Sequence, residues 1–205
     1  MNPLGINGSA VLAMRGKDCV AIATDMRLGM QFKTISTDFP KVFQFGSRLF
    51  VGFPGLATDT LTVSQMFDFR KNMYELRENR PLKPRVALSM LSNLLYSRRF
   101  GPYFVEPVVA GIDPVTMEPF VGTMDLIGCA NEANDFSLSG TCTEQLFGMC
   151  ETMWEKDMSP DALFECISQC MLNALDRDCS SGWGVRVFLI TQDQVTISDL
   201  KARMD

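Results

Sequence analysis

The sequence predicts an α+β fold arranged as a four-layer αββα sandwich, and the order of its hydrophobic patterns carries this prediction. Strand-like segments come first, followed by two helical patterns, more strands, two further helical patterns and two final strands. Each helix pair must cover one face of a sheet, and the other face must find a second apolar surface. Two stacked antiparallel sheets with helices outside satisfy both demands. The absence of repeats and linkers predicts a single domain over residues 1–205.

The first half of the chain supplies four short strands and two helices. Apolar residues recur at steps of three and four from about residue 58 until Pro81, which predicts a helix. Pro84 suits the first turn of a second helix, which we expect to continue to Arg99 before Gly101 and Pro102 break it. The expected strands cover residues 10–14, 20–24, 42–45 and 49–53, with a turn around Gly29 and a polar, β-branched stretch at 33–38.

The second half repeats this alternation. Ser159 followed by Pro160 is typical of a helix start, because serine caps the helix and proline fits its first position. We expect this helix after an earlier one over residues 143–154. The expected strands cover residues 104–112, 120–127, 136–139, 185–191 and 195–200.

Composition excludes several classes of function. The net charge of −5 argues against nucleic acid and anionic membranes as main partners. No apolar run approaches the roughly 20 residues that span a bilayer, and the first ten residues lack the features of a secretory signal. The chain has no histidine, which removes Ser-His-Asp triads, Cys-His dyads and histidine-based metal sites.

The seven cysteines indicate free thiols in a reducing compartment. Their number is odd and no Cys-x-x-Cys occurs, so neither a disulfide framework nor a zinc site is favoured. Cys166 and Cys170 are four residues apart, which places them on one helix face as two small buried residues.

Several motifs resemble those of a known family. They are ATDMR with Asp25 and Arg27, Lys41 sixteen residues after Asp25, FPGLATD with Gly55, and RDCSSG with Asp178 and Ser181. Together with the element order, they resemble the β-type subunits of the 20S proteasome, which are N-terminal nucleophile hydrolases. Longer runs such as YSRRFGPYFVEPVVAGIDP and LKARMD resemble one eukaryotic paralogue. The resemblance covers essentially the whole chain and implies the N-terminal nucleophile hydrolase fold.

In active relatives, an N-terminal threonine freed by cleavage after glycine is the nucleophile, and its own α-amine is the base. The resemblance places Ser9 at the nucleophile and Gly8 before the scissile bond, although a one-residue gap would instead place Gly8 at the nucleophile. Thr141 falls near an accessory serine of the family. The remaining matches are the aspartate Asp25, the lysine Lys41, the oxyanion glycine Gly55 and the accessory pair Asp178 and Ser181.

Two departures from the pattern lead us to expect no catalytic residue in this chain. Threonine is replaced by serine, and Met1 is still attached, so residues 1–8 are expected to form a short uncleaved extension. Without cleavage at Gly8–Ser9 there is no free amine on Ser9 to act as the base. We therefore interpret Ser9, Asp25, Lys41, Gly55, Asp178 and Ser181 as a vestigial constellation whose charged members fix the strand ends. The alternative is a serine-type N-terminal nucleophile peptidase activated by cleavage at Gly8–Ser9.

The resemblance implies two further sites. The segment with Asp125 and Cys129 borders the substrate channel of the neighbouring beta type-2 subunit in the family, where Asp125 would favour basic substrate residues; the alternative is a solvated aspartate at a strand end. No cofactor is required. In some family members a loop holds Mg²⁺ together with a C-terminal carboxylate from the opposite ring, and hard oxygen ligands suit this ion. Here the ligands would be the carbonyls of Leu175, Asp178 and Ser181 together with Asp205. The alternative to a Mg²⁺ site is that these residues form an ordinary loop.

As implied by the resemblance, the expected function is structural. The chain would form part of a β ring and of the chamber wall of the 20S core particle in ATP- and ubiquitin-dependent protein degradation, in the cytoplasm and nucleus. Its partners would be α-ring subunits, beta type-2 and beta type-4 neighbours and the opposite β ring, while unfolded polypeptide passes through the chamber. A self-assembling ring, as in simpler bacterial relatives, is disfavoured by the paralogue-specific runs.

Overall fold

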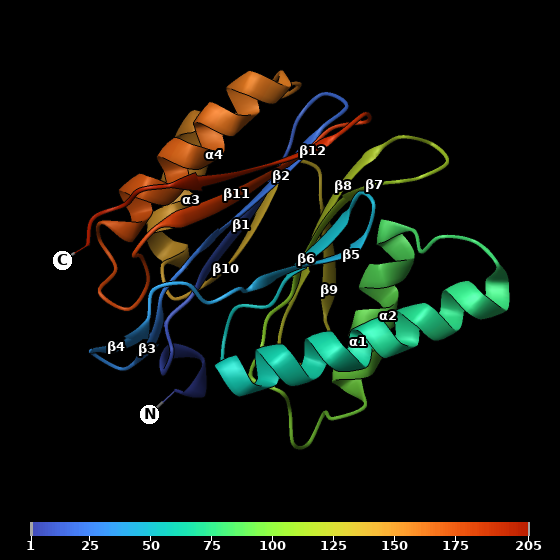
Figure 1. Cartoon of the computed structure of the whole chain (residues 1–205), viewed down its shortest axis with the longest axis horizontal. Helices are drawn as coiled ribbons and strands as arrows, with labels where there is room; N and C mark the ends of the chain where they lie inside the picture. Colours follow the sequence, from blue (N-terminus) through green and yellow to red (C-terminus); the bar gives the residue numbers. More distant parts are fainter. Residues whose placement is uncertain (1, 205) are drawn as a thin grey trace.

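A computed structural model describes residues 2–204 and confirms the four-layer αββα arrangement within them (Figure 1). Every strand pair is antiparallel. The first five-stranded sheet has the order β10 (Phe136–Gly140), β1 (Ala10–Arg15), β2 (Val20–Asp25), β11 (Val185–Ile190) and β12 (Val195–Leu200). The second has the order β5 (Val42–Gly46), β6 (Leu49–Gly52), β7 (Val108–Ile112), β8 (Pro119–Met124) and β9 (Ala130–Ala133).

Helices cover the outer face of each sheet, and a small hairpin stands at one end of the sandwich (Figure 1). Helices α1 (Ala57–Glu78) and α2 (Pro84–Tyr96) lie on the second sheet, whereas α3 (Thr143–Met153) and α4 (Pro160–Leu175) lie on the first. The hairpin consists of β3 (Leu28–Met30) and β4 (Lys33–Ser36), and a short 3₁₀ turn spans Pro3–Gly5. None of the helices among residues 2–204 has the length and apolar character needed to cross a membrane.

Strand β1 shows how alternation creates the layers. Leu12 and Met14 point into the core beneath α3 and α4, whereas Val11 and Ala13 point into the core between the two sheets. A strand whose successive side chains are apolar on both faces must lie between two covered surfaces. The buried β1 therefore forms a rigid base for the residue that precedes it, Ser9.

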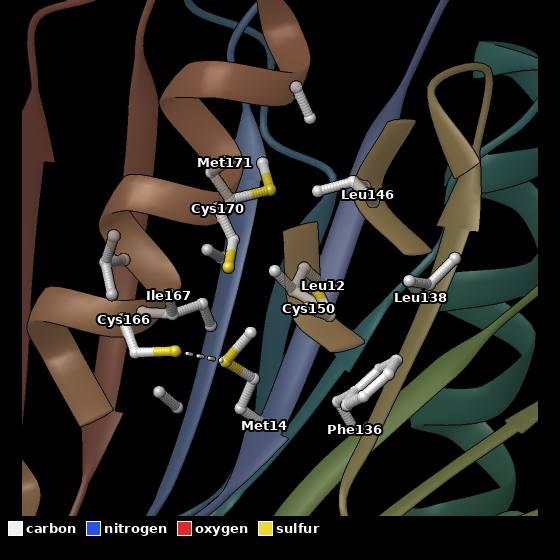
Figure 2. Packing of buried hydrophobic residues seen from close by; sticks show 14 of the residues in the cluster. Leu12, Met14, Phe136, Leu138, Leu146, Cys150, Cys166, Ile167, Cys170 and Met171 are labelled. Carbon is white, nitrogen blue, oxygen red and sulfur yellow. Dashed lines mark hydrogen bonds between the residues drawn. The ribbon is translucent and has the colours of Figure 1, made fainter. Parts of the chain in front are cut away.

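The core under α3 and α4 is rich in sulfur (Figure 2). The Cys166 thiol lies 3.8 Å from the Met14 sulfur, and Cys150, Cys170 and Met171 are labelled around it. Hydrogen bonding to Cys170 and burial raise the pKa of Cys166, and hydrogen bonding to Cys150 and burial raise the pKa of Cys170 to about 12. These thiols are free and protonated core residues, as predicted for Cys166 and Cys170.

The helix starts agree closely with the sequence. The Ser159 side chain accepts a hydrogen bond from the Ala162 N–H, and Pro160 begins α4. Pro84 begins α2, which ends at Tyr96 rather than at Arg99 because the chain tightens into turns there. The expected strand over 104–112 begins only at Val108.

One further strand prediction was wrong in part, and one strand was missed. The strand expected over residues 120–127 ends at Met124, because residues 125–129 form a turn held by the Asp125 carboxylate. Strand β9 was not predicted, because Ala130–Ala133 lies at the sheet edge, is largely exposed and has little β-branched character.

Candidate functional site

Ser9 lies directly before β1 and is buried, with 1% of its surface exposed. The backbone N–H of Gly55 donates a hydrogen bond of 3.1 Å to the Ser9 hydroxyl oxygen, and the Thr141 N–H donates one of 2.7 Å to its carbonyl. Gly8 instead packs against the carbonyl of Ser180. Of the two alignments left open by the sequence, this geometry favours Ser9 over Gly8 at the nucleophile position.

Asp25 and Lys41 form an ion pair behind Ser9. The Lys41 ammonium lies 2.6 Å from Asp25 Oδ1 and also donates to the Arg27 carbonyl over 2.7 Å. The Asp25 carboxylate, at the end of β2, additionally accepts hydrogen bonds from the N–H groups of Ala10 and Gly182. Burial lowers the pKa of Lys41, although the neighbouring Asp25 opposes this shift. The pair therefore joins β1, β2 and the loop after α4.

Asp178 organises the loop after α4. One carboxylate oxygen accepts hydrogen bonds from the hydroxyls of Thr141 and Ser181, and the other accepts from the Ser180 N–H and hydroxyl. Burial alone would raise the pKa of Asp178, but the hydrogen bonds outweigh it and hold the pKa below its usual value of 3.8. The structure thus brings together all six residues of the predicted constellation, with Thr141 linking Asp178 to Ser9.

Residues 2–8 are fixed beside Ser9. The Ile6 carbonyl accepts a hydrogen bond of 2.8 Å from the Gln31 N–H, and the Asn7 carbonyl accepts one of 3.1 Å from the Gly29 N–H. The Asn7 side chain donates to the Gly29 carbonyl and accepts from the Ala57 N–H, over 2.8 and 2.9 Å. The extension therefore runs along β3 and is tied to the start of α1. Met1 lies outside the described residues.

Gly8 is the bend in this extension, and only glycine fits there. Its φ of +70° is rarely adopted by other residues, and a Cβ would lie 1.7 Å from the Ser180 carbonyl oxygen. Arg27, which is 2% exposed, donates to the same carbonyl and to the Gln31 carbonyl. The bend, the hairpin and the loop after α4 thus hold one another.

The arrangement carries only part of the machinery for nucleophilic catalysis. It has a buried hydroxyl, a glycine N–H beside it and a lysine paired to an aspartate. In the described chain, however, the Ser9 nitrogen is an amide joined to Gly8, and its N–H points at the Thr141 hydroxyl over 3.4 Å. An amide nitrogen is no base, so a mechanism that uses the Ser9 α-amine would require cleavage at Gly8–Ser9.

Sequence reasoning missed two members of the site. Cys142 is completely buried, and burial followed by the charges of Asp178 and Asp25 raises its pKa to about 12. Because Cys142 directly follows Thr141, which the resemblance had placed near the site, its position in the sequence could have indicated it. Asn7 was missed because its contacts join three segments that are distant in the sequence, and the local sequence pattern does not predict these contacts.

Asp125 and Cys129, predicted to border a neighbouring substrate channel, take no part in the hydrogen bonds around Ser9. Asp125 is exposed, and its carboxylate accepts hydrogen bonds from the N–H groups of Ile127 and Cys129 over 3.1 and 2.7 Å. Cys129 is exposed as well. Leu175, Asp178 and Ser181 line one cavity of about 420 Å³, next to Arg203 near the end of the chain. Asp205 lies outside the described residues. Among those described, no cluster of three or more Cys, Asp or Glu side chains could hold a metal.

Comparison with known proteins identifies the family. Residues 6–190 match the family model described as proteasome subunit. The chain is 60% identical over 205 residues to the proteasome subunit beta type-3 of Drosophila melanogaster, with all of both chains covered. It is 52% identical over 204 residues to the protein of the same name in Saccharomyces cerevisiae, covering 100% of this chain and 99% of that one, and 50% identical over all 205 residues to that of Dictyostelium discoideum. With its four-layer fold and the constellation around Ser9, the chain belongs to the proteasome subunit family, as a β-type subunit of the core particle.

Proposed function

We propose that this proteasome subunit is non-catalytic and contributes wall and interface rather than an active site. The observation that carries the proposal is the peptide-bonded Ser9 nitrogen, held in place by an extension that is itself hydrogen bonded at Ile6 and Asn7. The α-amine that would act as the base does not exist while Gly8–Ser9 is intact. The Asp25–Lys41 pair then serves as a structural link between strands.

The test is the intact mass of this chain in the assembled particle, after treatment with a peptide epoxyketone that reacts with an N-terminal hydroxyl and its amine together. We expect a chain that retains residues 2–8 and carries no adduct. Adducts on other subunits of the same particle are the positive control. A chain that begins at Ser9 and carries the adduct would overturn the proposal.

A second candidate function is a serine-type N-terminal nucleophile peptidase. It is favoured by the 3.1 Å hydrogen bond between Gly55 and Ser9 and by the nearby Lys41, because these groups have the chemistry of a nucleophile, an oxyanion donor and a charged partner. It requires cleavage at Gly8–Ser9. The same mass measurement therefore separates the two functions.

The place of the subunit in the particle is also part of the proposal. Its partners are α-ring subunits above, beta type-2 and beta type-4 neighbours in its own ring, and the opposite β ring, within particles of the cytoplasm and nucleus. The names of the beta type-3 relatives support a place in the particle, and the specific neighbours and compartments are the proposed part. Cross-linking of purified particles followed by mass spectrometry should link this chain to those subunits, and cross-links to other β types within the ring would contradict it. A fluorescent fusion should appear in both compartments.

We further propose that Asp125 and Cys129 border the substrate channel of the beta type-2 neighbour. The Asp125 carboxylate is exposed, which leaves its charge able to act on a neighbouring chain, although two N–H groups of its own turn already engage it. Asp125→Ala should slow cleavage after basic residues by the particle, with Glu151→Ala on the exposed face of α3 as the control. Unchanged cleavage would contradict the role.

The loop after α4 is proposed as a Mg²⁺ site that is not required for folding. Leu175, Asp178 and Ser181 line one cavity, and carbonyl oxygens such as theirs suit Mg²⁺. Arg177 and Arg203 line the same cavity and oppose a cation there, so a carboxylate such as Asp205 would be needed. Particle crystals grown in millimolar Mn²⁺ should show an anomalous peak at this loop, and a featureless map would remove the proposal.

A further inference from the structure

The cavity beside Ser9 is built partly from the extension. It has a volume of about 370 Å³, and Asn2, Leu4 and Gly5 form one wall, while Pro54 and Gly55 form another. The extension thus leaves part of the cleft open and gives it an additional side. This cavity is distinct from the one next to Arg203 at the loop after α4.

Glu106 is the one charged residue among those described that line this cavity. Its backbone N–H donates to the Pro54 carbonyl over 3.2 Å, and the adjacent Val105 forms a bridge with Gly55. The hydroxyl of Ser139, which is 3% exposed, donates to Glu106 Oε2 over 3.0 Å. The backbone of Glu106 is therefore held in position, and its carboxylate is held by one neutral hydroxyl.

No cation neutralises Glu106 within residues 2–204. Its side chain takes part in none of the ion pairs there, and its described side-chain hydrogen bond is the one from Ser139. A carboxylate can accept about four hydrogen bonds, so most of its capacity is open. A positioned, unneutralised carboxylate in a cavity that also contains the apolar side chains of Leu4 and Pro54 suits a cation attached to an apolar stem.

We propose that this cavity binds the guanidinium side chain of an arginine carried by an extended polypeptide. The guanidinium fork matches a carboxylate with two parallel hydrogen bonds, which a lysine ammonium cannot make. The methylene stem of arginine would lie against Leu4 and Pro54. The cavity then acts as a docking point for basic unfolded chain, independent of any bond cleavage.

The inference rests on one part of the proposed function, namely that the extension is retained, because the extension supplies a wall. The intact mass of the sample used for binding separates the two ideas. If the chain has lost residues 2–8, the proposed function fails; if it retains them and the probe does not bind, only the cavity assignment fails.

The experiment titrates the full chain with N-acetyl-arginine methylamide and with the neutral citrulline counterpart, observed by the ligand's NMR saturation transfer. We expect the arginine probe to bind at least roughly fivefold more tightly than the citrulline probe, because charge-assisted hydrogen bonds are stronger than neutral ones. Glu106→Gln should remove this preference, whereas Glu151→Gln, an exposed glutamate on α3, should retain it.

Thermal unfolding of each variant shows whether it remains folded. A second measurement needs no variant, because raising the salt concentration should weaken binding of the arginine probe to the wild-type chain and leave the citrulline probe unaffected. Equal binding of both probes, or an arginine preference that survives in folded Glu106→Gln, would overturn the proposal.

Discussion

The Gly55 N–H donates its hydrogen bond to the hydroxyl oxygen of Ser9 over 3.1 Å, joining residues that are 46 positions apart in the chain. In an active relative such a glycine N–H would stabilise the oxyanion of a substrate. Here it is engaged by the side chain of Ser9, while the Ser9 nitrogen remains an amide. The residues around this contact can therefore be tested as structural elements.

The bend at Gly8 should tolerate no side chain. Gly8→Ala places a Cβ against the Ser180 carbonyl and forces a left-handed backbone onto alanine, which costs roughly 1–2 kcal/mol before the clash is counted. We expect a lower melting temperature and faster amide exchange at Gly29 and Gln31, whose N–H groups donate to the carbonyls of Asn7 and Ile6. Gly5→Ala is the control, because no atom lies within 4 Å of its added Cβ. Equal melting temperatures and exchange rates in the two variants would show that Gly8 does not hold the extension as described.

The ion pair of Asp25 and Lys41 should behave as a buried pair. Lys41→Met leaves the Asp25 carboxylate buried without its cation and should lower the free energy of unfolding by about 3–5 kcal/mol, as measured by urea denaturation. Lys71→Met breaks a more exposed pair with Glu75 and should cost about 0.3–0.5 kcal/mol. Adding Asp25→Asn to Lys41→Met should recover part of the loss; a further, additive loss would argue that the two groups are not coupled.

Asp178 should make stability depend on acidity. Its pKa is lower in the folded chain than its ordinary value of 3.8, so its contribution is present above pH 3.8 and is lost as the pH falls through the folded value. Asp178→Asn should be less stable near neutral pH and lose less stability on acidification over that window. Asp176 is an exposed neighbour, and the Asp176→Asn variant should show the same pH dependence of stability as the wild type. If the free energy of unfolding depended on pH in the same way for wild type and Asp178→Asn, the lowered pKa assigned to Asp178 would be refuted.

Thiol reactivity should follow burial. A maleimide should add rapidly to Cys129 and Cys179, which are exposed, and should spare the five buried cysteines until the chain unfolds. Burial also raises the pKa of Cys19 to about 11 and that of Cys142 to about 12, so little thiolate is present at neutral pH. Mass spectrometry should find two adducts in the native chain. Rapid labelling of Cys142 would mean that the site around Ser9 opens.

Much of the fold could be predicted because strong local patterns agreed with the tertiary structure. Ser159 and Pro160 fixed the start of α4, and the two-sided apolar pattern of β1 required a covered sheet. Strand β9 could not be predicted, because its pairing with β8 supplies what its own residues lack. The early end of β8 depended on the turn chemistry of Asp125, which sequence reasoning had placed inside a strand.

The charged and hydroxyl members of the site could be located through the family resemblance. The support from Asn7 could not, since it depends on Gly29 and Ala57 arriving at the same place in three dimensions. Glu106 was likewise not singled out, because a glutamate in a loop has no distinctive spacing. The contacts of residues such as Asn7 and Glu106 depend on segments that are distant in the sequence and meet around them only in the folded chain.

The central position of β1 has a consequence for how the protein is made. Ala10 pairs with Gly140 and Met14 with Phe136. The strand partner on this side of β1 is therefore synthesised only after more than half of the chain has left the ribosome. Contacts between such distant segments slow folding, and an unpaired strand edge invites association with other chains during that interval. This edge of β1 therefore stays unpaired during synthesis until Phe136–Gly140 has been made.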